Sequence, residues 1–240
     1  MGNAGEPYWK FRKPKSDSKT IVNPVETDEF DSSKLGMQWQ WQNDYKESYG
    51  QATSMGFFRL FTYALPELGD VSNLWYVPNM LLQKIPADEF TATTKLSFCS
   101  RNSDQYVGLV CMSAEYSSVG LQRTEDGYEL QIRHNPNAMR THLTDEVLTV
   151  DTLKPTQKGT PRKGRPAEMH IKDVYLRMSI KDSKVNYAYS IDGKKWKKAG
   201  GEYAMGKGRW IGSKIGFFAD DPNNTGRKGF IDIDWFRISR

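Results

Sequence analysis

The chain has 240 residues, a formal net charge of +5 and an aromatic content of 12%. Disordered chains are poor in aromatic residues, so this composition excludes a mainly unfolded protein. The length suffices for one large domain, or two small ones, with a substantial buried core. The sequence contains no run of about 18 apolar residues, which excludes a helical membrane span.

The basic residues are concentrated in three stretches, at 10–19, 158–165 and 194–198. The first two contain Pro, Gly, Ser and Thr and are typical of linkers or loops, and the third flanks a turn. Such runs more often form a solvated surface than a phosphate-binding face. No nucleic-acid-binding motif accompanies them, so we expect neither a nucleic acid nor a membrane as partner.

Residues 1–25 are charged, contain Pro7, Pro14 and Pro24, and show no sustained period. We interpret them as an interdomain linker. The first residues lack the apolar stretch of a secretion signal. A polar, Pro-containing start indicates that the chain is a piece of a longer protein, so its compartment stays unknown.

From residue 26 onward, short alternating segments recur about every ten residues, separated by turn residues, which is typical of a sandwich or barrel. The expected strands are 27–31, 37–41, 57–62, 90–98, 106–113, 118–122, 127–132, 174–180, 184–190, 194–198, 214–219 and 230–238. Ile191, Asp192 and Gly193 form a strong turn signal between two of them. Almost no segment has a helical period. We therefore predict an all-β, jelly-roll or concanavalin A-like two-sheet sandwich over 26–240.

The region 134–170 is the least regular part of this domain, with four prolines and a basic run. We expect a long loop or insertion with one strand at 146–150. His134, His142 and His170 lie in or beside it without the spacing of a metal site, and are expected to be surface or loop residues.

Two cysteines, Cys99 and Cys111, do not make a disulfide framework. If 96–99 and 107–112 form a hairpin, Cys99 faces Gly108 rather than Cys111. We therefore expect two buried free thiols that act as small apolar residues.

Acidic residues gather near both ends of the predicted domain. Asp232 and Asp234 share a face of a strand, as the two carboxylates of a glycosidase can, but the further Glu expected as acid is missing. These acidic residues suit a calcium site better than a catalytic pair, since hard cations take several oxygen ligands. Glu29 or Asp31 together with Asp234 would form this structural calcium site if the termini pair. Solvated surface carboxylates are the alternative.

Aromatic and amide residues alternate in the segment GMQWQWQND, which contains Trp39, Trp41 and Asn43. On a strand both indoles would face one side and could stack on sugar rings, while amides bind hydroxyls. The alternative is that both tryptophans belong to the core. Trp75 and Tyr76, just before Pro78, could bind sugar, cap the sandwich or dock another domain.

Several blocks, in order from about Val25 to Arg240, resemble the C-terminal β-sandwich of family 43 glycoside hydrolases, which include β-xylosidases and α-L-arabinofuranosidases. The blocks are FDSSKLGMQWQWQND, LWYVPNMLLQKIPADEFTATTKLSF, YVGLVCMSAEYSSVGLQR, YAYSIDGKKWKKAGG and WIGSKIGFFA through IDIDWFRIS. The region 134–170 matches poorly.

The resemblance implies a concanavalin-like accessory domain that packs on a catalytic five-bladed propeller. In some members this domain binds xylan as a carbohydrate-binding module. No catalytic residue carries over, because catalysis resides on the propeller, so we expect no enzyme in this chain alone. The expected partners are a plant cell-wall polysaccharide or its oligosaccharides, such as xylan or arabinoxylan, and the propeller. A secreted or periplasmic parent protein is favoured.

Overall fold

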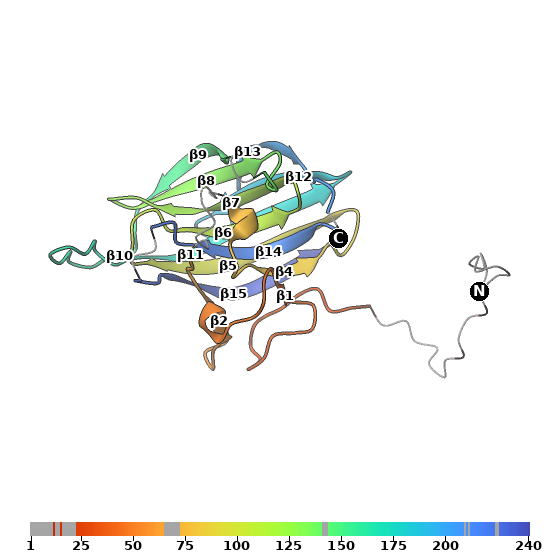
Figure 1. Cartoon of the computed structure of the whole chain (residues 1–240), viewed down its shortest axis with the longest axis horizontal. Coiled ribbons are helices and arrows are strands. Elements are labelled where there is room, and N and C mark those ends of the chain that lie inside the picture. The colour runs from red at the N-terminus through yellow and green to blue at the C-terminus, as the bar shows by residue number, and fades with distance from the viewer. Residues whose placement is uncertain are drawn as a thin grey trace.

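The structure is a computed structural model that describes residues 12, 15, 23–64, 73–140, 144–208, 210, 212–223 and 226–240. These residues form two antiparallel sheets of a sandwich, as the strand spacing predicts (Figure 1). The helical elements in these ranges are two 3-10 turns, η2 (Glu47–Tyr49) and η3 (Leu74–Tyr76). No helix in the described part of the chain is long and apolar enough to span a bilayer.

One sheet has seven strands in the order β1-β4-β14-β6-β7-β8-β9. Its strands are β1 (Gln40–Trp41), β4 (Leu81–Lys84), β6 (Tyr106–Met112), β7 (Tyr116–Arg123), β8 (Tyr128–Asn135), β9 (Glu146–Leu153) and β14 (Lys214–Asp220).

The other sheet has eight strands, seven of them in the order β13-β12-β11-β5-β15-β3-β2, with β10 paired to β11. Its strands are β2 (Gly50–Ala52), β3 (Phe58–Phe61), β5 (Phe90–Ser100), β10 (Gln157–Lys158), β11 (Met169–Lys181), β12 (Lys184–Ser190), β13 (Lys197–Ala204) and β15 (Phe230–Ser239).

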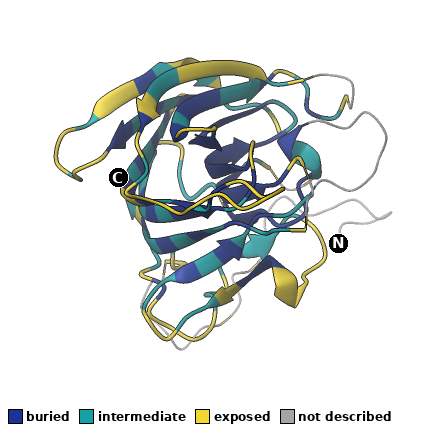
Figure 2. Ribbon diagram, turned by 90° about the vertical axis from the view of Figure 1, so that its left-hand side faces the viewer, coloured by how far each residue is buried: buried dark blue, intermediate teal, exposed yellow. Residues whose placement is uncertain are grey.

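The main core lies between the two sheets and follows the period of two along the strands. In β5, Phe90, Leu96 and Phe98 are buried, whereas intervening residues such as Lys95 are partly exposed. Each large apolar side chain buried in this way contributes about 1.5–3 kcal/mol. Figure 2 shows that buried residues fill the interior, whereas much of the exposed chain is in turns and outer strands.

A second core covers the outer face of the seven-stranded sheet. Leu74, Val77 and Met80, from the segment that contains η3, pack against Tyr106 and Phe218 there. This layer explains why every residue of β6, β7 and β14 is buried, although a one-sided sheet would alternate. The packing fixes the η3 segment against the sheet.

The two ends of the predicted domain lie side by side, as the calcium hypothesis required. Asp28 pairs with Phe236 of β15 through two backbone hydrogen bonds of 2.8 and 2.7 Å. Its carboxylate accepts the indole N–H of Trp39 at 2.7 Å and the backbone N–H of Phe30 at 2.9 Å. The first described segment is thereby attached to the last strand.

The expected hairpin between 96–99 and 107–112 is wrong, because β5 and β6 belong to different sheets. Cys99 instead lies opposite His170 of β11. Both cysteines are nevertheless free and buried, as predicted. The expected insertion at 134–170 contains the long edge strand β9, which extends the seven-stranded sheet.

The predicted turn at 191–193 is present between β12 and β13. The Asp192 carboxylate accepts the backbone N–H groups of Lys194 and Lys195 at 2.8 and 2.7 Å, and Gly193 has a φ of 69°. A side chain at this positive φ would be strained, so glycine suits the position. Strand β13 begins at Lys197, three residues later than expected, because these bonds hold 194–195 in the turn.

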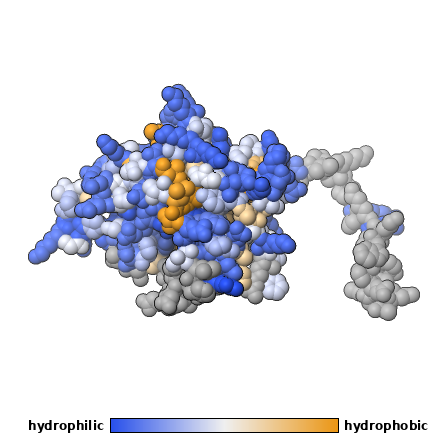
Figure 3. Space-filling view, turned by 90° about the horizontal axis from the view of Figure 1, so that it is seen from above, coloured by the Kyte–Doolittle hydropathy of each residue, from blue (hydrophilic) through white to orange (hydrophobic). Residues whose placement is uncertain are grey.

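The surface is mostly hydrophilic, with one apolar strip visible from above (Figure 3). The edge strand β9, at the top of Figure 1, carries the exposed apolar side chains of Val147 and Leu148, which are 54% and 48% exposed.

Asp220, at the end of β14, is a buried carboxyl group. Burial raises its pKa to about 7, against the opposing effect of Arg133, and neighbouring Asp221 raises it further. The unfolded chain would release this proton near pH 4. Between about pH 4 and 7 the folded state therefore holds a proton that the unfolded state has lost, so the free energy of unfolding falls as pH rises.

We predict that Asp220→Asn, which cannot ionise, removes this loss of stability. The variant should exceed the wild type in unfolding free energy at pH 8 by a few kcal/mol, roughly 4 at most, and should approach it near pH 4. Urea unfolding at both pH values measures the difference. An equal difference at both pH values would contradict a raised pKa for Asp220.

Candidate aromatic binding site

The candidate site is a pocket of about 300 Å³ outside the seven-stranded sheet, with Trp75 and Trp210 among its lining residues. The volume lies at the lower end of the range of small-ligand pockets. Its other lining residues are Gln42, Met112, Ser113, Gly208, Gly212 and Lys214.

Trp75 is held in place by the short turn η3. The Asn73 side chain caps this turn, accepting the backbone N–H of Trp75 at 3.1 Å and donating to the Ala138 carbonyl at 3.1 Å. The backbone N–H of Leu74 donates to the Tyr116 hydroxyl at 2.9 Å. With Leu74 buried in the second core, the half-buried indole of Trp75 has a fixed support.

Three further lining residues, Gly208, Trp210 and Gly212, follow β13 in the sequence and precede β14. Gly208 lies so close to Gly212 that a Cβ on Gly208 would come within 2.1 Å of the Gly212 carbonyl carbon. Gly212 also has a positive φ of 78°, which suits glycine. Gly208 and Gly212 therefore lie against each other, and Trp210 is 86% exposed.

Polar groups meet the two indoles in this pocket. Lys214 Nζ donates to Gln42 Oε1 at 2.8 Å, and burial lowers the pKa of the Lys214 amine. Ser113 provides a hydroxyl group. Flat apolar rings beside amide, ammonium and hydroxyl groups suit a ring-shaped ligand with hydroxyl groups at its edge.

The predicted strip of Trp39 and Trp41 is not an exposed sugar platform. Trp39 is 8% exposed, contacts Phe30, Phe217 and Phe236, and donates its indole N–H to Asp28. The core alternative therefore holds for Trp39, since no face of the indole is left for a sugar.

Trp41 is half-buried, with Tyr45, Tyr49 and Phe58 around its ring. It lines a separate open groove with Tyr45 and Glu47. Asn43 is exposed, and its side-chain oxygen accepts the backbone N–H of Asp44 at 2.9 Å.

Of the sugar-binding residues predicted from sequence, the pocket thus contains Trp75. Tyr76 is half-buried and does not line the pocket. Gln42, one of the amides in the GMQWQWQND segment, also lines the pocket, whereas Trp210 was not predicted from the sequence. The segment GKGRWIG, with a tryptophan between closely spaced glycines, is the signal that could have indicated Trp210.

Two of the three predicted calcium ligands, Glu29 and Asp234, are engaged in ion pairs on the surface. Arg237 binds Glu29 through two hydrogen bonds of 2.8 Å and lowers the pKa of that carboxyl. Asp234 pairs with Lys95 at 3.0 Å, and Asp31 is exposed. Calcium binding here stays a prediction, and a cation would have to displace both basic side chains.

Asp232 and Asp234 are not arranged as an acid and nucleophile pair. Arg59 binds both oxygens of Asp232, at 2.7 and 2.8 Å. A bulge between Ile233 and Trp235 shifts Asp234 out of register with β5. Each carboxylate faces a cation, so neither is placed to donate a proton to a glycosidic oxygen.

The two packed antiparallel sheets define a concanavalin A-like sandwich. Residues 27–239 match the model of the beta xylosidase C-terminal concanavalin A-like domain, and the chain belongs to this family. The family resemblance noted from the sequence blocks is thereby confirmed.

Among curated proteins, the chain is similar to a beta-xylosidase of Formosa agariphila, with 27% identity over 97% of this chain and 38% of that protein. A putative beta-xylosidase of Xylanibacter ruminicola is 27% identical over 88% of this chain and 34% of its own length. The chain therefore spans little more than a third of these relatives. The crystal structure of the GH43 protein BlXynB from Bacillus licheniformis shares the fold, with a TM-score of 0.70 and 22% identity, covering 92% of this chain and 40% of that one.

Trp39 should act as a structural residue. We predict that Trp39→Ala lowers the free energy of unfolding by about 3–5 kcal/mol, because it empties a core position, and leaves the Asp28 carboxylate without its indole donor. Urea unfolding measures this change. Trp196→Ala is the matched control, since Trp196 is half-exposed beneath Arg177, and its loss should cost far less. Equal costs for both variants would place Trp39 outside the core.

Proposed function

We propose that this chain is the noncatalytic accessory domain of a β-xylosidase or α-L-arabinofuranosidase, and that it binds xylan or arabinoxylan oligosaccharides in the Trp75–Trp210 pocket. The pocket carries this proposal, because it places two indoles beside Gln42, Ser113 and Lys214. An indole stacks on the apolar face of a pyranose, and the polar side chains bind its hydroxyl groups.

Two further observations support a noncatalytic role. Asp232 and Asp234 are each bound to a basic side chain. The chain spans 34–38% of the curated beta-xylosidases that it matches, which leaves ample length for a catalytic domain. We infer that hydrolysis takes place on that other part, the five-bladed propeller that the family resemblance implies.

The binding test uses isothermal titration of this chain with xylo-oligosaccharides and arabinoxylan fragments. Trp75→Ala and Trp210→Ala should each weaken binding about tenfold or more, as expected when a central aromatic contact is lost. Trp196→Ala should bind as the wild type does, and unchanged melting temperatures would show that the variants are folded. Absence of binding by the folded wild type, or equal binding by all variants, would contradict the proposal.

A second candidate function is docking, in which the same surface packs on the catalytic propeller and closes one side of its substrate site. Trp210, which is 86% exposed, and the half-buried Trp75 line one pocket beside polar residues, and this favours docking, since exposed apolar surface rimmed by polar groups marks interaction sites. We expect the separately produced propeller to bind this chain, and Trp210→Ala to weaken the complex. Sugar binding that persists in the isolated chain separates the first function from the second.

A further inference from the structure

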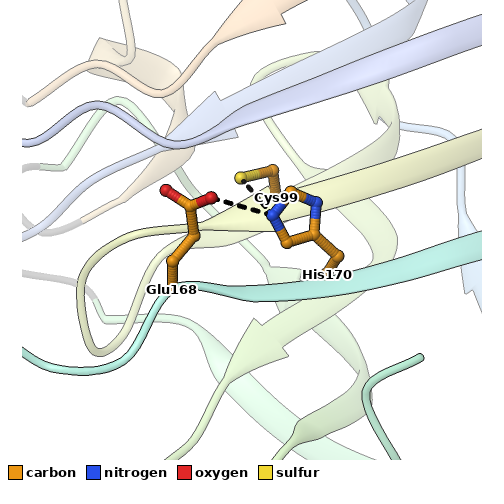
Figure 4. A group of neighbouring side chains, drawn as sticks. All are labelled: Cys99, Glu168 and His170. Carbon is orange, nitrogen blue, oxygen red and sulfur yellow. Dashed lines mark hydrogen bonds and ion pairs between the residues drawn. The ribbon is translucent and has the colours of Figure 1, made fainter. Parts of the chain in front are cut away.

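A cysteine, a glutamate and a histidine meet on the outer face of the eight-stranded sheet. Cys99 of β5 lies directly opposite His170 of β11. Their neighbours Phe98 and Ile171 point into the core, so Cys99 and His170 point away from it. Glu168 precedes His170 by two residues, and in Figure 4 its carboxylate points toward the same imidazole.

The distances within this group are close to those of a metal centre. His170 Nε2 lies 3.4 Å from Cys99 Sγ and 2.9 Å from Glu168 Oε1, and all three ligand atoms lie within 4.8 Å of one another. Tetrahedral zinc, with bonds of about 2.0–2.3 Å, places its ligand atoms about 3.3–3.6 Å apart. The two distances to His170 Nε2 thus differ from this spacing by a few tenths of an ångström, and a shift of about an ångström at most would bring Cys99 Sγ and Glu168 Oε1 to it.

The arrangement does not fit a nucleophilic triad. Cys99 and Glu168 both contact the same ring nitrogen of His170, so the imidazole cannot take a proton from one side while the other side is held. Burial and the Glu168 carboxylate also raise the pKa of the Cys99 thiol to about 12, the opposite of activation.

We propose that Cys99, Glu168 and His170 form a binding site for a zinc-type divalent cation. A thiolate, a carboxylate and a neutral imidazole together carry two negative charges, which a divalent ion balances. The protein supplies three ligands, which leaves the fourth tetrahedral position to water or another ligand.

The surroundings favour a borderline-soft metal over calcium. Arg101 Nε donates to Glu168 Oε2 at 2.7 Å, which orients the carboxylate and leaves Oε1 on the side of His170. The open groove beside Glu168 is lined by Arg101, Arg227 and Lys228 and gives access from solvent. Because these basic residues oppose a cation held by charge alone, thiolate and imidazole bonding must supply the affinity.

Cobalt(II) is a suitable probe, since a thiolate ligand gives it an intense charge-transfer absorption in the near ultraviolet. Titration of the full chain should produce this band with one equivalent of Co²⁺, and Zn²⁺ should displace the cobalt whereas Ca²⁺ should not. Because the chain has two cysteines, Cys99→Ala should abolish the band and Cys111→Ala should keep it. His170→Gln and Glu168→Gln, at partly exposed positions, should weaken zinc affinity at least tenfold.

A thermal melt provides the second measurement. Zn²⁺ should raise the melting temperature of the wild type and of Cys111→Ala but not that of His170→Gln. Absence of a thiolate band in the folded wild type, or a band that persists in Cys99→Ala, overturns the proposal. If Cys99→Ala does not fold, an undiminished band and an undiminished zinc shift in folded His170→Gln overturn it as well.

Discussion

The fold depends on the insertion of the last strand, β15, into the eight-stranded sheet between β5 and β3. Both neighbours need this strand, because it satisfies their backbone groups on one side and brings Ile231, Ile233 and Phe236 into the core. The sheet therefore cannot be completed until the end of the chain is present. The pairings of β15 with β3 and β5 join residues far apart in sequence, which predicts slow folding relative to helical domains of this size.

The position of β15 also determines how the N-terminal part of the domain packs. Asp28 pairs with Phe236 and receives the indole N–H of Trp39, so the aromatic-rich segment packs against the final strand. That packing turns Trp39 inward. From there the segment continues through β1 to Gln42, which reaches the pocket. The second core holds Trp75 on the same side of the sandwich. Two long-range contacts therefore shape the pocket: the pairing of Asp28 with Phe236 positions the segment that contains Gln42, and the second core positions Trp75.

The sequence predicted the sandwich well and the site only in part. Alternation and turn residues were sufficient for β5, β12 and the turn at Asp192, because these features are local. The Trp39 and Trp41 pattern could not distinguish a core from a sugar platform, since both place indoles on one side of a strand. The second core was hidden because β6, β7 and β14 are buried on both faces. Cys99 and His170 are 71 residues apart, and their pairing follows from sheet order alone.

We propose that sugars bind in the Trp75–Trp210 pocket, whereas Trp39 is a structural residue of the core. The indole N–H signals of the seven tryptophans can be followed by NMR as xylo-oligosaccharide is added to the ¹⁵N-labelled chain. The account predicts saturable shifts at Trp75 and Trp210, and none at Trp39, whose indole N–H is held by Asp28. Shifts centred on Trp39, or no shift at Trp75 and Trp210 at saturating sugar, would contradict it.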